Sequence, residues 1–353
     1  MLNRKDPWLG VNLSLFFPGL GQIYAGKIEK GGIFLAVHIG LMILTLWSIF
    51  APRGSLTIAL FYLFLAAILY LANLFDAFRC LDPNPNNPQA EKIPRTRKNP
   101  WFAVLLSRIL PGLGQFYLQN AVLGGLFLGL TIILSFADDF WPILSPIASA
   151  IAALSAYHAY CAFPQKSPLK NGRTLIANMA IAILIGGILT RYIPLGLSHY
   201  LEIFVVPSSS MQPTLHIGDR ILVTKFASYR PQPGDLVVFV APERALALDP
   251  KLPPNEEIFF VKRAIASGGQ TVKVTGGLVY VNDRPIRENY ALAPSTYELP
   301  PQQIPPQSYW VLGDNRNNSF DSHIWGVLPA ENIIGRAYKI IFPLGRSRSL
   351  LPR

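Results

Sequence analysis

The sequence predicts a protein in two parts, an N-terminal α-helical region that crosses a membrane several times and an all-β domain after it. Two observations lead to this division. Hydrophobic residues make up 51% of the 353 residues and charged residues only 14%, a composition typical of membrane proteins. The long apolar runs all lie before residue 198. The remainder alternates short β-branched runs with Gly, Pro, Asn and Asp turns, as all-β domains do.

An internal repeat organises the N-terminal region. The stretch RKDPWLGVNLSLFFPGLGQIY begins at Arg4, and RKNPWFAVLLSRILPGLGQFY begins at Arg97, an offset of 93 residues. Each copy continues with a Gly-Gly pair and a long apolar run. A match at constant spacing predicts a duplicated module, with the first repeat at 1–93 and the second at 94–173. Its role stays open between helix packing, substrate recruitment and lipid contact.

Five apolar runs are long enough to cross a bilayer, for which about 17–25 residues are needed. They cover about 31–50, 55–75, 122–138, 141–163 and 174–197. The two PGLGQ stretches carry Pro and Gly in mid-run and basic residues at both ends. That pattern favours re-entrant or interfacial hairpins over full spans.

The basic loops predict the orientation in the membrane. Loops 76–100 and 164–173 are rich in Lys and Arg and are therefore expected on the cytoplasmic side. The span at 174–198 then acts as an anchor that delivers the β-domain, 199–353, to the extracytoplasmic side. We expect a multi-pass protein of the cell membrane, inner or plasma, with the lipid bilayer as a partner.

The net charge of +11 is explained by the same positive-inside bias. No basic stripe interleaved with aromatic residues occurs, so nucleic acid is not an expected partner. Cys80 and Cys161 lie where apolar runs meet basic loops and are expected to be reduced. Neither belongs to a metal-ligand spacing, so we expect no metal and no cofactor.

Three consecutive serines in PSSSMQPTL, residues 207–215, raise the question of a serine nucleophile. A serine hydroxyl needs a neighbouring base to attack at neutral pH. One candidate base is a histidine, His216 or His323, the latter with Asp321 two residues away. The other is Lys262, which stands inside the apolar run FFVKRAIA, where burial would lower its pKa. Taken one by one, each of these residues is more often structural, and the alternatives stay open at this level.

The combination of motifs resembles the signal peptidase I family, a bacterial-type leader peptidase with a Ser/Lys dyad. It consists of PSSSMQPTL, IGDRILVTKF, PGDLVVF, KRAI and GDNRNNSFDSHIWG, in that order, over about residues 200–342. The resemblance does not reach residues 1–173. It implies a signal-peptidase-like β fold for the domain, which would be extracytoplasmic and catalytic.

The resemblance also implies roles for individual residues. Ser210 stands at the position of the nucleophile and Lys262 at that of the general base. Ser208 would form the oxyanion hole with the backbone N–H of Ser210, and Ser319 would orient the lysine. The supporting polar residues would be Asp321 and Arg316, and the apolar substrate pocket would be lined by Phe204, Val206, Leu215 and Val261.

Two departures from the family pattern affect local loops. Ala266 is followed by Ser-Gly-Gly-Gln, residues 267–270, where the family often has Leu-Pro-Gly-Asp. His323 stands where an arginine is usual, so an Asp–Arg salt bridge would become a weaker contact between Asp321 and His323.

The function implied is that of a membrane-bound serine endopeptidase that removes N-terminal signal peptides from exported preproteins. It would cleave after small residues through an acyl-enzyme. Signal-peptide-bearing preproteins would be its partners, and the secretion translocon is a further candidate. Two alternatives remain, a specialised processing peptidase of the same fold and a non-catalytic scaffold that binds peptides.

Overall fold

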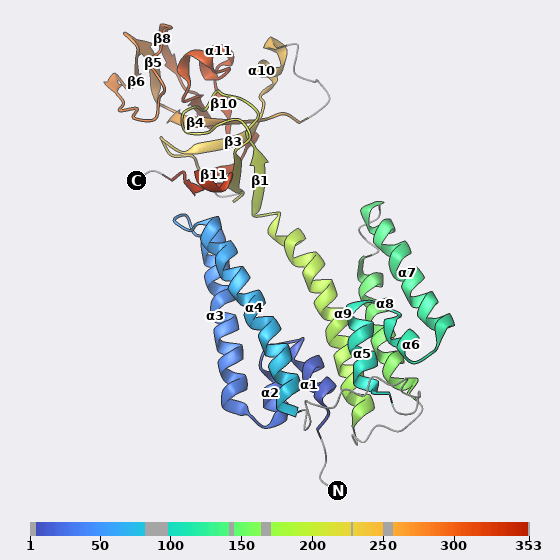
Figure 1. Cartoon of the computed structure of the whole chain (residues 1–353). Coiled ribbons are helices and arrows are strands. Elements are labelled where there is room, and N and C mark those ends of the chain that lie inside the picture. The colour runs from blue at the N-terminus through green and yellow to red at the C-terminus, as the bar shows by residue number, and fades with distance from the viewer. Residues whose placement is uncertain are drawn as a thin grey trace. The chain divides into compact units, whose positions relative to one another are not determined.

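The computed structural model describes residues 5–81, 98–140, 145–163, 171–226, 229–249 and 257–351. These fall into two compact units. The first comprises Met1–Thr45 and Leu60–Leu195, and the second comprises Leu46–Ala59 and Gly196–Arg353. Helices build the first unit and two β-sheets dominate the second (Figure 1).

Nine helices account for most of the described residues before residue 198. They are α1 (Pro7–Ser14), α2 (Leu20–Ala25), α3 (Ile28–Phe50), α4 (Leu56–Leu81), α5 (Pro100–Ile109), α6 (Leu113–Tyr117), α7 (Ala121–Phe140), α8 (Ser145–Cys161) and α9 (Gly172–Leu197). Among the described residues α3, α4 and α9 are long and apolar enough to cross a membrane. The expected span 122–138 corresponds to α7, whose apolar part is the shorter stretch Ala121–Phe136. The expected span 141–163 corresponds to α8, a helix of 17 residues, and residues 141–144 before it lie outside the described part of the chain.

The two copies of the repeat begin with the same capped helix. Asp6 caps α1 by accepting hydrogen bonds from the first free backbone amides of the helix, and Asn99 does the same for α5. Each helix has a proline in its first turn, where the missing N–H costs no hydrogen bond. The caps also contact each other, because the Asn99 side-chain amide donates to Asp6 Oδ2 at 2.8 Å.

The glycines of the PGLGQ motif allow a turn that other residues would not. Gly19 has φ 96° and Gly112 has φ 102°, values that favour glycine. A Cβ on Gly19 would lie 2.0 Å from the carbonyl oxygen of Gly31, and one on Gly112 would lie 2.4 Å from that of Gly124. In each copy the motif glycine and the first glycine of the Gly-Gly pair are therefore explained together, since they meet backbone to backbone.

The glutamine of the motif satisfies the backbone polar groups that this turn exposes. Gln22 donates to the carbonyl oxygen of Asn73 at 3.0 Å, and Gln115 donates to that of Ser155 at 2.8 Å. The same two partners accept from the turn amides, Asn73 from Gly19 and Ser155 from Gly112. Within each copy the backbone polar groups at the helix interruption thus have hydrogen-bond partners, as an apolar surrounding requires.

The second unit contains the β-domain. Its elements are β1 (Leu201–Val205), β2 (Arg220–Thr224), β3 (Leu236–Val240), α10 (Glu243–Leu248), β4 (Phe259–Ser267), β5 (Thr271–Thr275), β6 (Leu278–Val281), β7 (Arg284–Pro285), β8 (Leu299–Gln303), β9 (Ser308–Leu312), α11 (Ser322–Trp325), β10 (Leu328–Pro329), β11 (Ile333–Phe342) and β12 (Arg348–Ser349). The larger sheet has the order β1-β2-β11-β3-β4-β9-β10 with β12 paired to β11, and the smaller has the order β7-β6-β5-β8. The helical region followed by a β-rich domain confirms the predicted fold class.

The Pro-rich segment APSTYELPPQQIPPQS, residues 293–308, contains a strand. β8 carries Pro300 and Pro301, yet it pairs with β5, with Thr271 opposite Gln303. β8 stands at the edge of the smaller sheet, and an edge strand tolerates proline because one of its sides needs no N–H donor.

Strand β4 carries Lys262 through the interior of the larger sheet. It lies between β3 and β9, with Lys262 opposite Val237 on β3. Buried residues of both neighbouring strands form the apolar cores around it. A side chain from the middle of β4 is therefore taken out of water by the fold itself.

Candidate active site

The three-serine turn lies between β1 and β2 and is held in place by the loop after β9. The backbone amide of Asn315 donates to the carbonyl oxygen of Ser210 at 3.0 Å, and its side chain donates to that of Ser209 at 3.3 Å. The side chain of Asn318 donates to Ser209 Oγ at 3.3 Å. These contacts fix Ser209 and the backbone of Ser210 to the loop after β9.

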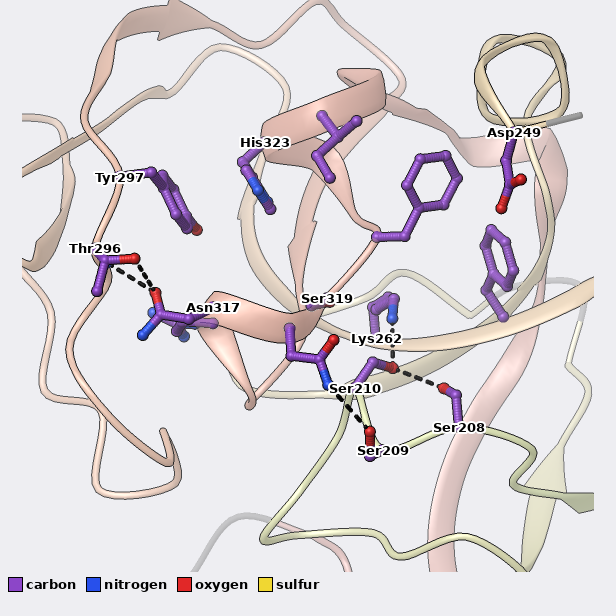
Figure 2. A pocket seen from close by; sticks show the side chains of 15 residues that line it. Ser208, Ser209, Ser210, Asp249, Lys262, Thr296, Tyr297, Asn317, Ser319 and His323 are labelled. Carbon is purple, nitrogen blue, oxygen red and sulfur yellow. Dashed lines mark hydrogen bonds between the residues drawn. The ribbon is translucent and has the colours of Figure 1, made fainter.

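Lys262 and Ser210 meet inside the fold. Lys262 Nζ lies 2.6 Å from Ser210 Oγ (Figure 2), and the two residues are only 4% and 8% exposed. Burial lowers the pKa of Lys262 to about 8, although the charges of Asp321 and Asp314 act in the opposite direction. The amine is thus within hydrogen-bond distance of the hydroxyl, and its neutral form is far more populated at physiological pH than that of a lysine in water.

The other two serines of the expected site lie in the same cavity. Ser208 Oγ is 3.1 Å from Ser210 Oγ, and Ser208 is an exposed residue. Ser319 Oγ is buried, and it makes no hydrogen bond with any described residue. The hydrogen bond expected between Ser319 and Lys262 is therefore not formed in this structure.

Gly313 explains how closely these groups are packed. A Cβ at this position would lie 2.1 Å from Ser319 Oγ and 2.5 Å from the carbonyl oxygen of Ser210. Only a residue without a side chain leaves room for both. The glycine of the GDNR motif is therefore part of the packing that brings the two serines to one place.

Asp321 is fully buried and binds three groups of its own loop. It accepts from the backbone amide of Gly313 at 2.8 Å and from that of His323 at 3.1 Å, and His323 Nδ1 lies 2.7 Å from its Oδ1. The imidazole of His323 stacks on Tyr297, with the ring centroids 4.1 Å apart. Since Ser210 bonds to Lys262 and not to a histidine, the geometry favours lysine over the histidine alternative.

Arg316 holds the loop in a second way. Its Nε donates to the carbonyl oxygen of Gly313 at 3.0 Å, and its Nη1 donates to Glu288 at 2.6 Å. Glu288 lies in the segment between β7 and β8, where no sequence pattern singles it out. Its contact with an arginine 28 residues away could be found only in the fold.

A similar network ties the strand of Lys262 to the loop. Arg263, the next residue along β4, donates to both carboxylate oxygens of Asp314, at 2.8 and 2.6 Å. Asp314 also accepts from the hydroxyl of Thr214, which follows the serine turn. One buried carboxylate therefore joins the segments that carry the hydroxyl and the amine.

A cavity of about 520 Å³ opens at the paired serine and lysine. Figure 2 shows Thr296, Tyr297, Asn317 and His323 along its wall. Thr296 and Tyr297 come from the segment before β8, and sequence reasoning missed both. Each has a neighbour on the loop after β9, because Asn317 accepts from Thr296 and His323 stacks on Tyr297.

The four residues expected to line the substrate pocket gather in one apolar cluster. Val206 and Leu215 are buried in it, and Phe204 and Val261 pack against it. None of the four is among the residues that line the cavity. The expected pocket residues and the residues that line the cavity are therefore two different sets.

The described residues contain no group of three or more His, Cys, Asp or Glu side chains placed to hold a metal ion. The chemistry that the site offers is that of a hydroxyl, a desolvated amine and hydrogen-bond donors around them. This set matches a nucleophile with its base.

Comparison with known proteins places the second half of the chain among peptidases. A family described as "Signal peptidase, peptidase S26" matches residues 174–342. A signal peptidase I of Leptolyngbya laminosa is 46% identical over 149 residues, which are 42% of this chain and 71% of that protein. A probable signal peptidase I-2 of Synechocystis sp. is 41% identical over 186 residues, 52% of this chain and 77% of that protein. The thylakoidal processing peptidase 1 of Arabidopsis thaliana is 44% identical over 134 residues, 37% of this chain and 39% of that protein.

Proposed function

The chain belongs to the signal peptidase I family and removes signal peptides from preproteins, and we propose that it does so with Ser210 as the nucleophile and Lys262 as the general base. The observation that carries this proposal is the distance of 2.6 Å between the two groups, deep in the fold. The lowered pKa of Lys262 supports it, because a base must be neutral before it can accept a proton.

The proposed reaction has two halves. Lys262 takes the proton of Ser210 Oγ while the oxygen bonds to the carbonyl carbon of the scissile peptide bond. The ammonium then returns that proton to the leaving nitrogen as the carbon–nitrogen bond breaks, and the signal peptide remains as an ester on Ser210. A water molecule attacks the ester with Lys262 again as the base, and the hydroxyl of Ser210 is restored.

Two further serines would stabilise the charged groups that form during this cycle, the oxyanion and the ammonium of Lys262. The hydroxyl of Ser208 and the backbone N–H of Ser210 would donate to the oxyanion that forms when the carbonyl carbon becomes tetrahedral. Ser319 would orient Lys262: its buried oxygen makes no hydrogen bond with the described residues, so it can accept from the ammonium once the proton has moved. Asp321 and Arg316 would support the loop that carries Ser319.

The apolar cluster of Phe204, Val206, Leu215 and Val261 would accept the residue before the scissile bond. A shallow apolar wall favours small side chains there, which agrees with cleavage after small residues. The cavity at Ser210 and Lys262 would leave room for the chain that follows the bond.

The protein is a membrane protein with several candidate spans. We propose that residues 199–353 are the peptidase domain, that 174–198 are its anchor, and that 1–93 and 94–173 are the two repeats. The basic loops support an extracytoplasmic domain at the cell membrane. Relatives named as thylakoidal make that membrane the alternative location. Exported preproteins would be the substrates, and the translocon that delivers them a candidate partner.

The direct test is cleavage of a preprotein by the full chain in detergent or liposomes. Ser210→Ala and Lys262→Ala should each abolish cleavage, and Lys262→Arg should fail as well, because a guanidinium stays protonated. His323→Ala should retain most of the rate. Substantial activity of Lys262→Ala, or a folded but inactive His323→Ala, would contradict the Ser/Lys assignment and favour the histidine alternative.

A further inference from the structure

A lysine of the β-domain binds the end of a membrane helix. Lys339 on β11 is completely buried. Its Nζ donates to three backbone carbonyl oxygens, those of Ser48 at 3.0 Å, Ile49 at 2.8 Å and Ala51 at 3.1 Å. These carbonyls belong to the last turn of α3 and the residue after it, where a helix leaves its acceptors without partners. An ammonium has three donors, and here each has an acceptor.

The adjacent tyrosine completes the arrangement. Tyr338 OH donates to the carbonyl oxygen of Phe50 at 3.3 Å. Consecutive residues of a strand normally point to opposite faces. Here the pairing of β11 with β2 shifts register between Ala337 and Lys339, and such a bulge re-aims side chains. As a result both Tyr338 and Lys339 reach the helix end, while Ala337 and Ile340 remain in the apolar core.

The turn between α3 and α4 is shaped to receive these two side chains. The last turn of α3 carries no basic residue of its own, and the ammonium of Lys339 places positive charge at the negative end of the helix dipole. Gly54 packs against the helix end, since a Cβ there would lie 2.3 Å from the carbonyl oxygen of Ser48. Residues Leu46–Ala59 belong to the same compact unit as the β-domain.

We propose that Lys339 fastens the α3–α4 turn, residues 46–59, to the peptidase domain, so that the first repeat serves as a second membrane anchor for that domain. The inference rests on the proposed function, since it concerns how that peptidase works on substrates in a membrane. The proposed role of the first repeat, that of a membrane anchor, is one that its sequence leaves open.

The expected benefit concerns substrates that are themselves in the membrane. A domain on one helix, α9, can pivot about its connection to β1, whereas a second attachment limits that freedom before the substrate binds. Restricting motion in advance raises the effective concentration of the site at the cleavage position. A short soluble peptide reaches the site by diffusion and gains nothing from the second attachment.

The first test measures the contact itself. The full chain in detergent is treated with a water-soluble amine-acylating reagent, and modified lysines are identified by mass spectrometry. Lys339 should be protected, while Lys273, a partly exposed lysine of the same domain, serves as the internal standard. Gly54→Val should raise acylation of Lys339 at least about tenfold, because the new side chain displaces the Ser48 carbonyl. Gly40→Val in the same helix is the matched control, since nothing lies within 4 Å of a Cβ there.

The second test measures the consequence. Lys339→Met should lower kcat/KM for a preprotein in liposomes about tenfold and should change turnover of a short soluble peptide less than about twofold. Gly54→Val leaves every residue of the β-domain intact and should behave in the same way, which covers the case in which Lys339→Met does not fold. Failure of the proposed dyad would instead show as turnover of both substrates retained in Ser210→Ala or Lys262→Ala, with Lys339 still protected.

Two results would overturn the proposal. One is acylation of Lys339 as fast as that of Lys273 in the unaltered chain, or no increase with Gly54→Val. The other is an equal loss on both substrates, or on neither, in a Gly54→Val chain whose Lys339 has become reactive.

Discussion

The pH dependence of cleavage follows from the burial of Lys262. Its pKa is lowered to about 8, and burial is the largest cause. With that pKa about a tenth of the lysine is neutral at pH 7 and about nine tenths at pH 9, so kcat/KM should rise about tenfold over this interval. For a lysine of ordinary pKa the neutral fraction at pH 7 would be about 300-fold smaller. The assay is turnover of a soluble peptide between pH 6 and 10.

A variant identifies the group that titrates. The charge of Asp321 raises the pKa of Lys262, so Asp321→Asn should move the midpoint of the profile down by about one pH unit. The position of the midpoint is informative even if the variant is slow. Asp283→Asn is the control, because this carboxylate is exposed on the smaller sheet. A midpoint near 10, or one that Asp321→Asn leaves in place, would refute a desolvated lysine as the base.

Three further predictions concern the same site. Lys262→Met should raise the melting temperature at pH 7: a folded-state pKa below the unfolded value costs about 3 kcal/mol. That cost is complete below pH 8 and vanishes as the pH rises to about 10.5, so the gain in melting temperature should vanish there too. Ser208→Ala should reduce kcat by about 10²–10³ with KM nearly unchanged, the usual effect of losing one oxyanion donor; a change in KM alone would contradict that role. Gly313→Ala should lower kcat at least about tenfold because its Cβ would lie 2.1 Å from Ser319 Oγ; Gly345→Ala, with open space around it, should match the unaltered chain.

The order of the motifs in the sequence predicted much of the architecture, but not the contacts between distant segments. Ser210 and Lys262 are recognisable because each stands in a distinctive local pattern, three serines in one case and an apolar strand in the other. Glu288 and Tyr297 come from a segment without periodicity, so nothing in the sequence marks them as partners of Arg316 and His323. Their contacts depend on how the smaller sheet places that segment.

Lys339 shows a different limit of sequence reasoning. In the run GRAYKIIF the alternation of a strand would place Tyr338 and Lys339 on opposite faces. The bulge between Ala337 and Lys339 cancels that alternation, and a bulge without glycine has no sequence signature here. Its partner carbonyls lie about 290 positions earlier in the chain, so a local reading would assign the lysine to solvent.

The contact between the caps of the two repeats has a consequence for how such modules pair. Asp6 and Asn99 occupy the same position in their copies, and the amide of one donates to the carboxylate of the other. Two first copies brought together in this way would oppose two carboxylates, which repel and have no proton to share at neutral pH. A carboxylate on one side and an amide on the other make the pairing complementary only between unlike copies. Because the second repeat has Asn99 where the first has Asp6, this contact favours pairing of the two repeats within one chain. It disfavours pairing of two first repeats from neighbouring chains.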